Sequence, residues 1–242
     1  DLLSLERRNL AMIDWNPFVA GLFNCLQDSK NVYQLMELGH CGTLSALIKK
    51  TKGGLPTSVC RFYMANLVAA LEFIHSLGLV HSDLKPGNIV IGADGYLMIC
   101  DLGVSAFEHE ERDWNDVGTT MYAPPDCIKG NMPPPGRRSM DVWAVGCILF
   151  EMATGRAVKT QSKPRRIELL NRVGSARWFW PRGMVVDETL KDMVNKMLAK
   201  EISERLGAIY TPGSRKNDEL RAHPFLRKFP WHQLNNRTLV VS

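Results

Sequence analysis

Hydrophobic and polar positions change their spacing several times along the chain, which predicts a mixture of helices and strands. Residues 1–12 place Leu3, Arg7 and Leu10 at the spacing of helical turns. Two runs of β-forming residues follow, 18–26 and 32–38, and the sequence Asp-Ser-Lys-Asn at 28–31 is typical of a turn between them. We therefore expect a helix and a β-hairpin at the start of the chain.

Beyond Gly42 the pattern becomes mainly helical. The clearest helix begins near Pro56, a residue favoured in the first turn, and ends at Gly78. One face of this helix carries apolar residues at intervals of three, four and three: Met64, Leu67, Leu71 and Ile74. Further helices are predicted over residues 140–154, 165–172 and 187–199.

Two short strands interrupt the helical part, at 89–91 and 96–100, around a turn at 93–95. The stretch 101–126 is polar and has no periodicity, and a loop of that length inside a compact domain is usually functional. A second loop, 131–136, is rich in proline. These elements predict an α+β fold in which a short β-rich part is followed by a mainly α-helical part.

The composition fits one globular domain. Of the 242 residues 45% are apolar and 23% are charged, so the chain can bury a core and is not expected to be disordered. The net charge is +5, and the Lys and Arg residues are scattered among acids rather than gathered in a stripe. This distribution argues against a nucleic-acid partner. We expect a monomer.

The six cysteines form no C-x-x-C pair and have no His at zinc-ligand spacing. This favours a reduced, intracellular setting, cytoplasmic or nuclear. The most apolar helical segment, 142–150, is too short to span a membrane, and no signal peptide is visible. Because the first residue is Asp1 rather than Met, we expect the sequence to be a piece of a longer polypeptide.

Two polar motifs flank the predicted strand pair. Residues 81–88 read His-Ser-Asp-Leu-Lys-Pro-Gly-Asn, and residues 101–103 read Asp-Leu-Gly. They resemble the catalytic loop (H-R-D-L-x-x-x-N) and the metal-binding motif (D-F-G) of eukaryotic protein kinases. Each motif alone is weak, but the two in this order around a strand pair are specific; the alternative is a set of solvated loop residues. The resemblance implies a protein-kinase-like fold, ATP and Mg²⁺ as cofactors, and protein substrates.

The residue types suit this chemistry, because phosphoryl transfer needs positioning and charge neutralisation from the protein. Asp83 would orient the attacking hydroxyl and accept its proton. Lys85, two residues on and on the same side of an extended loop, would lie beside the phosphoryl group. Asn88 and Asp101 would hold Mg²⁺, which prefers hard oxygen ligands. By resemblance, Lys85 implies serine or threonine substrates rather than tyrosine.

The resemblance continues through residues 118–126, which are similar to the kinase segment that ends in A-P-E. It implies that Thr119 hydrogen-bonds Asp83 and Lys85 as a third catalytic residue. Asp126 would form an ion pair with Arg205.

Other residues would have supporting roles. By resemblance, Asp141 would cap the backbone of the catalytic loop. An apolar stack between the two lobes would consist of Leu10, Leu22, His81 and Leu102. The residues expected to bind the nucleotide are Glu6, the hinge residues Met36, Glu37 and Leu38, and Val90 and Cys100. A reactive thiol at Cys100 is the alternative to an inert buried one, but no cation is visible beside it in the sequence.

The pattern departs from active kinases at the start of the chain. Active kinases carry a glycine-rich loop over the phosphates and a Lys that pairs with a helix Glu. Glu6 aligns with that Glu, but no G-x-G-x-x-G occurs and the first Lys is Lys30. We expect little or no catalysis from residues 1–242 alone. Two readings stay open: an active serine/threonine kinase whose remaining strands lie outside this segment, and a pseudokinase that acts as a binding or scaffold module.

A second departure concerns regulation. Ser82 replaces the Arg of H-R-D, which in relatives binds a phosphate on the activation loop. The usual acceptor position is Asn115, which cannot be phosphorylated. Our hypothesis is that the loop takes its working shape without phosphorylation, helped by its own acids at 108, 110 and 111; the alternative is degeneration of the switch.

The two ends narrow the resemblance to the AGC group, the kinases dependent on cyclic AMP or cyclic GMP and the C-type kinases. Residues 5–10 and 223–226, with Trp231 and Arg237, carry this likeness.

The likeness divides the chain into a remnant of the small lobe (1–38), the large lobe (39–226) and the start of a C-terminal tail (227–242). Gly87 and Thr43 replace acids that in relatives read basic substrate residues, whereas Glu151 remains. A strong preference for Arg-containing substrates is therefore not expected.

Overall fold

The computed structural model describes residues 2–110, 118–119, 121–129, 136–157, 180–208 and 218–239, without the side chains of residues 2–5, 128, 129 and 136. The helices in these ranges are α1 (Leu2–Ala11), α2 (Leu44–Lys50), α3 (Thr57–Ser76), α4 (Pro125–Lys129), α5 (Ser139–Thr154), α7 (Glu188–Met197), α8 (Glu219–Ala222) and α9 (Trp231–Asn235). The strands are β1 (Leu22–Gln27), β2 (Val32–Met36), β3 (Leu79–Val80), β4 (Ile89–Ile91), β5 (Leu97–Ile99) and β6 (Ala106–Phe107). Short 3-10 turns are η1 (Pro86–Asn88), η2 (Gly136–Arg138) and η3 (Ile202–Glu204).

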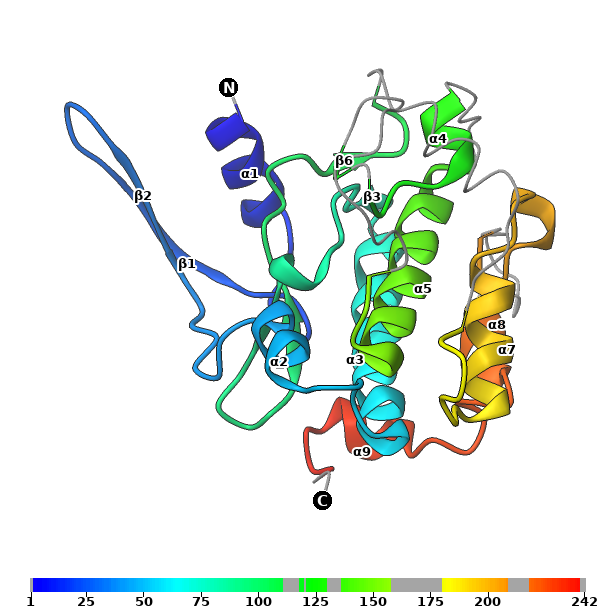
Figure 1. Ribbon diagram of the computed structural model, residues 1–242. Coiled ribbons are helices and arrows are strands. Elements are labelled where there is room, and N and C mark those ends of the chain that lie inside the picture. Colours follow the sequence, from blue (N-terminus) through cyan, green and yellow to red (C-terminus); the bar gives the residue numbers. More distant parts are fainter. Residues whose placement is uncertain are drawn as a thin grey trace.

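Helices α3 and α5 pack side by side at the centre of the helical part (Figure 1). Helix α3 begins after Pro56 and ends before Gly78, whose φ of +76° is a left-handed conformation that stops a helix. Helix α7 packs against α5, and Gly146 permits this approach, since a Cβ there would lie 2.9 Å from the Cβ of Met197. The apolar faces of these helices form one continuous core.

The predicted helices at 140–154 and 187–199 are confirmed as α5 and α7. The predicted helix at 165–172 and the loop at 131–135 lie outside the described residues.

Within the described part of the chain, α3 rather than segment 142–150 is the helix that is long and apolar enough to cross a membrane. Its most apolar stretch of 18 residues is nevertheless 67% buried inside the protein. Its position against α5 and β5 is that of a core helix, which satisfies the same length and hydropathy test.

The hairpin β4–β5 lies next to α3, and the two predicted catalytic motifs lie on either side of it in the sequence. A buried amide, Asn66 of α3, fixes it: the Asn66 Nδ2 donates to the carbonyl of Phe62 at 2.7 Å, and its Oδ1 accepts from the Leu97 backbone N at 3.0 Å. The hairpin therefore has a hydrogen-bonded register on the helix that supports it.

The first predicted strand, 18–26, divides in two. Only residues from Leu22 onward belong to β1, whereas the buried stretch 18–20 lies along β5. Ala20 N donates to Ile99 O and Ile99 N donates to Phe18 O, both at 2.9 Å. The prediction of one strand from residue 18 was wrong because these β-forming residues pair with β5, a distant strand, and not with β2.

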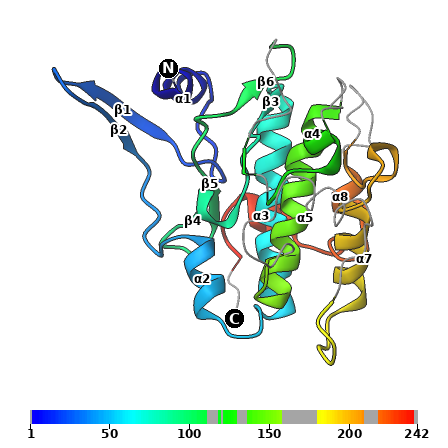
Figure 2. The ribbon, with the colours of Figure 1, turned by 45° about the horizontal axis from the view of Figure 1, so that its top comes forward.

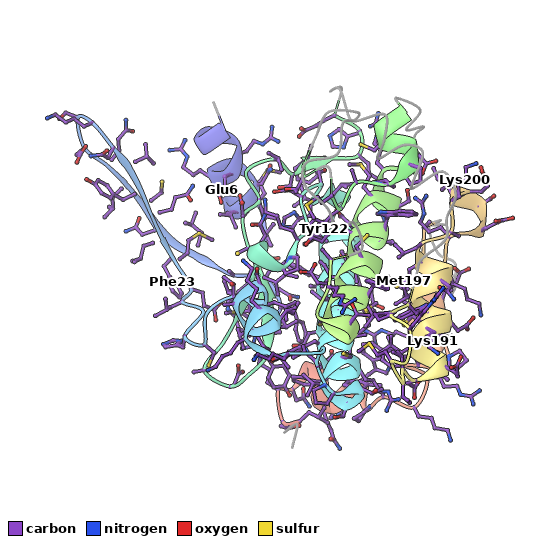
Figure 3. The ribbon with its side chains drawn as sticks, in the orientation of Figure 1. Glu6, Phe23, Tyr122, Lys191, Met197 and Lys200 are labelled. Carbon is purple, nitrogen blue, oxygen red and sulfur yellow. The ribbon has the colours of Figure 1, made fainter. Side chains whose placement is uncertain are left out.

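Strands β1 and β2 form an antiparallel ribbon that projects away from the helices (Figures 1 and 2). Figure 3 shows Phe23 on this ribbon, away from the helical part, and its exposed fraction is 66%. Other exposed apolar residues of the ribbon are Leu26, Val32, Tyr33 and Leu35. The ribbon is therefore joined to the body mainly through its base, where α1 contacts β1.

The long stretch 101–126 is not uniformly a loop. Strand β6 lies inside it and pairs with β3, and α4 begins at Pro125. Two-residue strands such as β3 and β6 are too short to give a periodic signal, so this pairing was not predicted from the sequence.

Candidate active site

The predicted catalytic loop, residues 81–88, connects β3 to β4 and includes η1. A buried carboxylate holds its backbone. Asp141, near the start of α5, accepts hydrogen bonds from the backbone N of His81 and of Ser82, each at 2.9 Å. His75 Nε2 contacts the same carboxylate at 2.8 Å. Burial alone would raise the pKa of Asp141, but the bond from His75, the charges of His75 and His81 and the His81 amide lower it below its usual value. The predicted capping role of Asp141 is confirmed.

Two residues at the edges of the site have left-handed backbones. Ser82 has φ +69° and Asp101 has φ +67°, backbone conformations that residues other than Gly adopt rarely. Strained residues of this kind tend to be kept at functional sites. The hydrogen bonds that Asp141 accepts from the backbone N of Ser82 and of the preceding His81 oppose this strain.

Asp83 is the centre of a hydrogen-bonded group that joins the catalytic loop to residue 119. Lys85 Nζ lies 2.5 Å from Asp83 Oδ2 and donates to Thr119 Oγ1 at 3.1 Å. The Thr119 backbone N donates to Asp83 Oδ1 at 2.6 Å. Asn88 Nδ2 donates to Asp83, at 3.1 Å to its carbonyl and 3.2 Å to its Oδ2. The expected contacts of Thr119 with Asp83 and Lys85 are thus present.

Gly118 makes this arrangement possible. Its φ is +82°, and a Cβ at this position would collide with the carbonyl oxygen of Ser82. The chain can approach the catalytic loop closely enough for Thr119 to reach Asp83 only because residue 118 has no side chain.

Asp101 follows β5 and is exposed beside the same loop. The Cys100 backbone N donates to Asn88 O at 2.9 Å, and His81 Nε2 contacts Cys100 O at 3.1 Å, so the two predicted metal ligands come from adjacent, connected segments. Because the Asn88 Nδ2 is engaged with Asp83, its Oδ1 is the atom suited to a cation. A carboxylate and an amide oxygen are hard donors that fit Mg²⁺.

Among the described residues no group of three or more His, Cys, Asp and Glu is arranged to hold a metal ion by itself.

Glu6 lies on α1 near Asp101. Partial burial raises the pKa of Glu6 above its usual value and the charge of Asp101 raises it further, against a lowering by the Gln34 side chain. A nearby cation would stabilise the ionised form of Glu6 against both effects. The charges around Glu6 and Asp101 therefore favour a cationic ligand or side chain at this place.

The expected nucleotide residues lie around the base of the ribbon. Gly39, which follows the hinge residues 36–38, lies directly on Val90, since a Cβ at Gly39 would be 2.5 Å from the Val90 Cβ. The Glu37 backbone N donates to Gly21 O at 2.9 Å, which ties the hinge to β1. Cys100 is partly buried, and burial together with Asp101 and Glu6 raises the pKa of its thiol to about 11. The thiol is therefore protonated and inert near neutral pH.

Two further contacts support the segment that contains Thr119. Tyr122, labelled in Figure 3, donates its hydroxyl to Glu151 Oε2 at 2.8 Å. Burial raises the pKa of Glu151, while the hydrogen bond from Tyr122 and the charge of Lys49 lower it. Arg205 is buried and donates from Nη2 to Asp126 Oδ2 at 2.7 Å, as expected.

Some residues of the site were not predicted from the sequence. Gly118 and Tyr122 were recognised only as members of a similar segment, and Asn9 of α1 only as a member of residues 5–10, with no role assigned to it. The available signal for Asn9 was a polar residue directly before an apolar position of the predicted helix. The carbonyl groups near its side chain, those of Leu102 and Ser105, lie more than 90 residues further along the chain.

Comparison with known proteins adds to this geometry. The chain matches the family described as "Protein kinase domain" over residues 3–226. It is 30% identical to 3-phosphoinositide-dependent protein kinase 1 of Arabidopsis thaliana, over 98% of the chain and 48% of the relative. It is 30% identical to cAMP-dependent protein kinase catalytic subunit 3 of Drosophila melanogaster, over 97% of the chain and 38% of the relative. The chain thus spans less than half the length of these two relatives.

Proposed function

The chain belongs to the protein kinase domain family, and from this premise we propose that the natural polypeptide carrying it transfers the γ-phosphoryl group of ATP to serine or threonine hydroxyls of protein substrates. The hydrogen-bonded group of Asp83, Lys85 and Thr119 is the observation that carries the proposal. A carboxylate beside an ammonium group and a hydroxyl at this spacing matches what phosphoryl transfer requires.

In this proposal Asp83 orients the substrate hydroxyl and accepts its proton as the oxygen attacks the γ-phosphorus and the bond to the leaving ADP oxygen breaks. Lys85 lies beside the transferred group and offsets its negative charge. Thr119 holds both side chains in place through its hydroxyl and its backbone N. Asn88 and Asp101 would hold Mg²⁺, which when bound neutralises charge on the phosphates.

The nucleotide side of the proposal uses the hinge and β4. Residues 36–38 would face the adenine ring, with Val90 beneath it and the Cys100 side chain in the wall. Glu6 would need a cationic partner, and the proximity of Asp101 increases that need. We assign residues 1–38 to the small lobe, 39–226 to the large lobe and 227–242 to the tail. We further propose an intracellular, monomeric protein; the free thiols of Cys25, Cys41, Cys60 and Cys100 support a reducing compartment.

The test uses the full natural polypeptide and a panel of serine-, threonine- and tyrosine-containing peptides with radiolabelled ATP and Mg²⁺. We expect labelled serine or threonine, and a loss of kcat of at least about 1,000-fold in Asp83→Asn with little change in nucleotide affinity. Glu188→Gln, which removes a carboxylate from an exposed ion pair of α7, is the control and should keep the rate. Labelling that survives Asp83→Asn would overturn the assignment.

A second candidate function is that of a pseudokinase acting as a binding module. Glu6 favours it, because the charge of Asp101 opposes the ionisation of this partly buried carboxyl group. A full natural polypeptide that binds a partner protein but neither Mg²⁺–ATP nor phosphoryl acceptors would support this candidate over catalysis.

A further inference from the structure

A polar cluster connects α1 to the segment that follows Asp101. Its centre is Asn9, a polar residue of α1 that has no exposed surface. The Asn9 Nδ2 donates to the carbonyl of Ser105 at 2.9 Å and lies 3.2 Å from the Ser105 hydroxyl and 3.5 Å from the carbonyl of Leu102. The Ser105 hydroxyl in turn donates to Leu102 O at 2.5 Å. A fully buried amide with its donors satisfied by another segment is a specific tie between the two.

Arg8 extends this tie toward the surface. Its Nε and Nη2 donate to the Asn9 Oδ1 at 3.2 and 3.1 Å, and the same Nη2 donates to Glu110 Oε1 at 2.7 Å. The guanidinium group fixes the orientation of the Asn9 amide, since the amide oxygen must face Arg8 and the amide nitrogen must face the carbonyl oxygens. Glu110, Arg8, Asn9 and Ser105 therefore form one chain of hydrogen bonds.

The segment that receives these bonds is anchored on its other side as well. The Glu108 backbone N donates to Gly78 O at 2.9 Å, next to the β3–β6 pairing. The Glu108 carboxylate pairs with Arg138 Nε at 2.8 Å, just before α5. The carboxylates of residues 108 and 110 thus engage arginines from two different elements, η2 and α1.

The cluster lies between residues that the proposed reaction needs. Glu6 is one turn before Asn9 on α1, and Asp101 immediately precedes Leu102. Ser82, where active relatives carry an Arg that binds a phosphate, provides no charge; its hydroxyl lies 3.5 Å from the carbonyl of Val80. Two acids are described in this segment, and each forms an ion pair with an arginine: Glu108 with Arg138 and Glu110 with Arg8.

We propose that Asn9, Arg8 and Glu110 are positioning residues, which hold α1 and the segment after Asp101 in their working arrangement through a carboxylate instead of a phosphate. This inference rests on the proposed kinase function. None of the three touches the reacting atoms; they act through Glu6 and Asp101.

The three residues contribute unequally. Arg8 and Glu110 are partly exposed, 45% and 26% of their side chains, and an exposed ion pair is weak and screened by salt. Asn9 is fully buried, so its removal leaves the carbonyl of Ser105 without this donor. We therefore expect Asn9→Ala to have the largest effect and Glu110→Gln a smaller one.

The experiment compares Asn9→Ala, Arg8→Gln, Glu110→Gln and the Arg8→Gln/Glu110→Gln double variant in the full natural polypeptide, with and without prior phosphatase treatment. We expect kcat to fall about tenfold in Asn9→Ala and about threefold in Glu110→Gln, with KM for the peptide unchanged. The double variant should be no slower than Arg8→Gln alone, because both changes break the same contact. Phosphatase should leave the wild-type rate unchanged. Glu188→Gln, which breaks an exposed pair of α7, is the control and should match the wild type.

Wild-type kcat in Asn9→Ala and Glu110→Gln, or a wild-type rate abolished by phosphatase, would overturn the proposal. Hydrogen exchange of the backbone amides in α1 and residues 102–110 provides a readout that does not depend on activity. Faster exchange in both segments of Asn9→Ala and Glu110→Gln, but not of Glu188→Gln, supports the tie, and unchanged exchange refutes it. If the wild type transfers no phosphoryl group, the proposed function fails, and the exchange measurement still decides whether the cluster joins the two segments.

Discussion

Glu6 shows at the scale of a single residue how burial near a like charge opposes stability. Its carboxylate is partly buried near a second one, Asp101, and its pKa is raised for both reasons, mainly by burial. A carboxyl group that binds its proton more tightly in the folded state than in the unfolded state destabilises the fold at any pH where it is ionised. A residue kept under such conditions is consistent with a role toward a cation.

Glu6→Gln should therefore raise the melting temperature of the ligand-free chain at pH 7 and lower the kcat of the full natural polypeptide. The gain is full above the raised pKa of Glu6 and should disappear as the pH falls below the ordinary value of 4.5, because the carboxyl group is then neutral in both states. Thermal unfolding between pH 4 and 8 measures this trend. Glu201→Gln, at an exposed position, serves as the control, and a lower melting temperature in Glu6→Gln at pH 7 would contradict the argument.

Gly118 is the second residue whose exchange is informative. Gly118→Ala should lower kcat about 100-fold, since the new Cβ would push the segment away from Ser82 and separate Thr119 from Asp83. Gly95→Ala is a matched control, because Gly95 also has a left-handed backbone, φ +81°, but has nothing within 4 Å of the added Cβ. Both variants should lose similar stability from backbone strain, and only Gly118→Ala should lose the rate. Equal rates in the two variants would show that the close approach at Ser82 is not needed.

At the scale of elements, the parts that depend on local pattern were predictable. Helix α3, with its proline start and glycine end, and the β4–β5 hairpin follow from spacing and turn residues close in sequence. The pairing of stretch 18–20 with β5 was not predictable in this way, because its partners lie about 80 residues further on. Residues of high β-propensity indicate a strand but do not indicate which strand it pairs with.

The candidate site follows the same division. The motifs at 81–88 and 101–103 indicated Asp83, Lys85, Asn88 and Asp101, and resemblance added Thr119. The ties that bring distant segments together, such as Asn9 to Ser105, carry no motif, because a single polar residue within a helix has many explanations. Only the fold shows which carbonyl groups it meets.

Arg205 joins several elements at once and offers a test at this scale. It donates to Asp126 of α4, to the hydroxyl of Ser139 in α5 and to the carbonyl of Ala199 after α7, and its guanidinium lies 4.9 Å from the Trp143 ring. Arg205→Met should reduce the free energy of unfolding by about 3 kcal/mol or more, because the partners of a buried arginine lose their donor together.

Urea unfolding of the 242-residue chain measures this loss. Lys191→Met breaks an exposed ion pair with Glu188 and should change the free energy of unfolding by less than about 0.5 kcal/mol. Similar losses in both variants would show that the buried network does not anchor α4, α5 and the end of α7 together.

At the scale of the whole molecule, the ribbon and the helical part differ in how they are held. The helical part has a large buried core, whereas the β1–β2 ribbon exposes apolar side chains such as Phe23 and Leu35. A two-stranded ribbon is marginally stable by itself in water. Its position therefore depends on what contacts it, and in the proposed function the nucleotide would be one such contact, since residues 36–38 at its base would face the adenine ring.

Binding of Mg²⁺ and a non-hydrolysable ATP analogue should therefore raise the melting temperature of the full natural polypeptide. At a ligand concentration of 100 times Kd the stabilisation is about 2.7 kcal/mol, which corresponds to roughly 5–10 °C for a domain of this size. Asp101→Asn should lose most of the shift that Mg²⁺ adds to the analogue, because it removes the charged ligand of the metal, whereas Glu188→Gln should keep it. The analogue without Mg²⁺ should shift Asp101→Asn at least as much as the wild type, since removal of a carboxylate near the phosphates reduces repulsion. An equal Mg²⁺-dependent shift in Asp101→Asn and the wild type would place the metal elsewhere, and the pairing of Asn88 with Asp101 as its ligands would then be wrong.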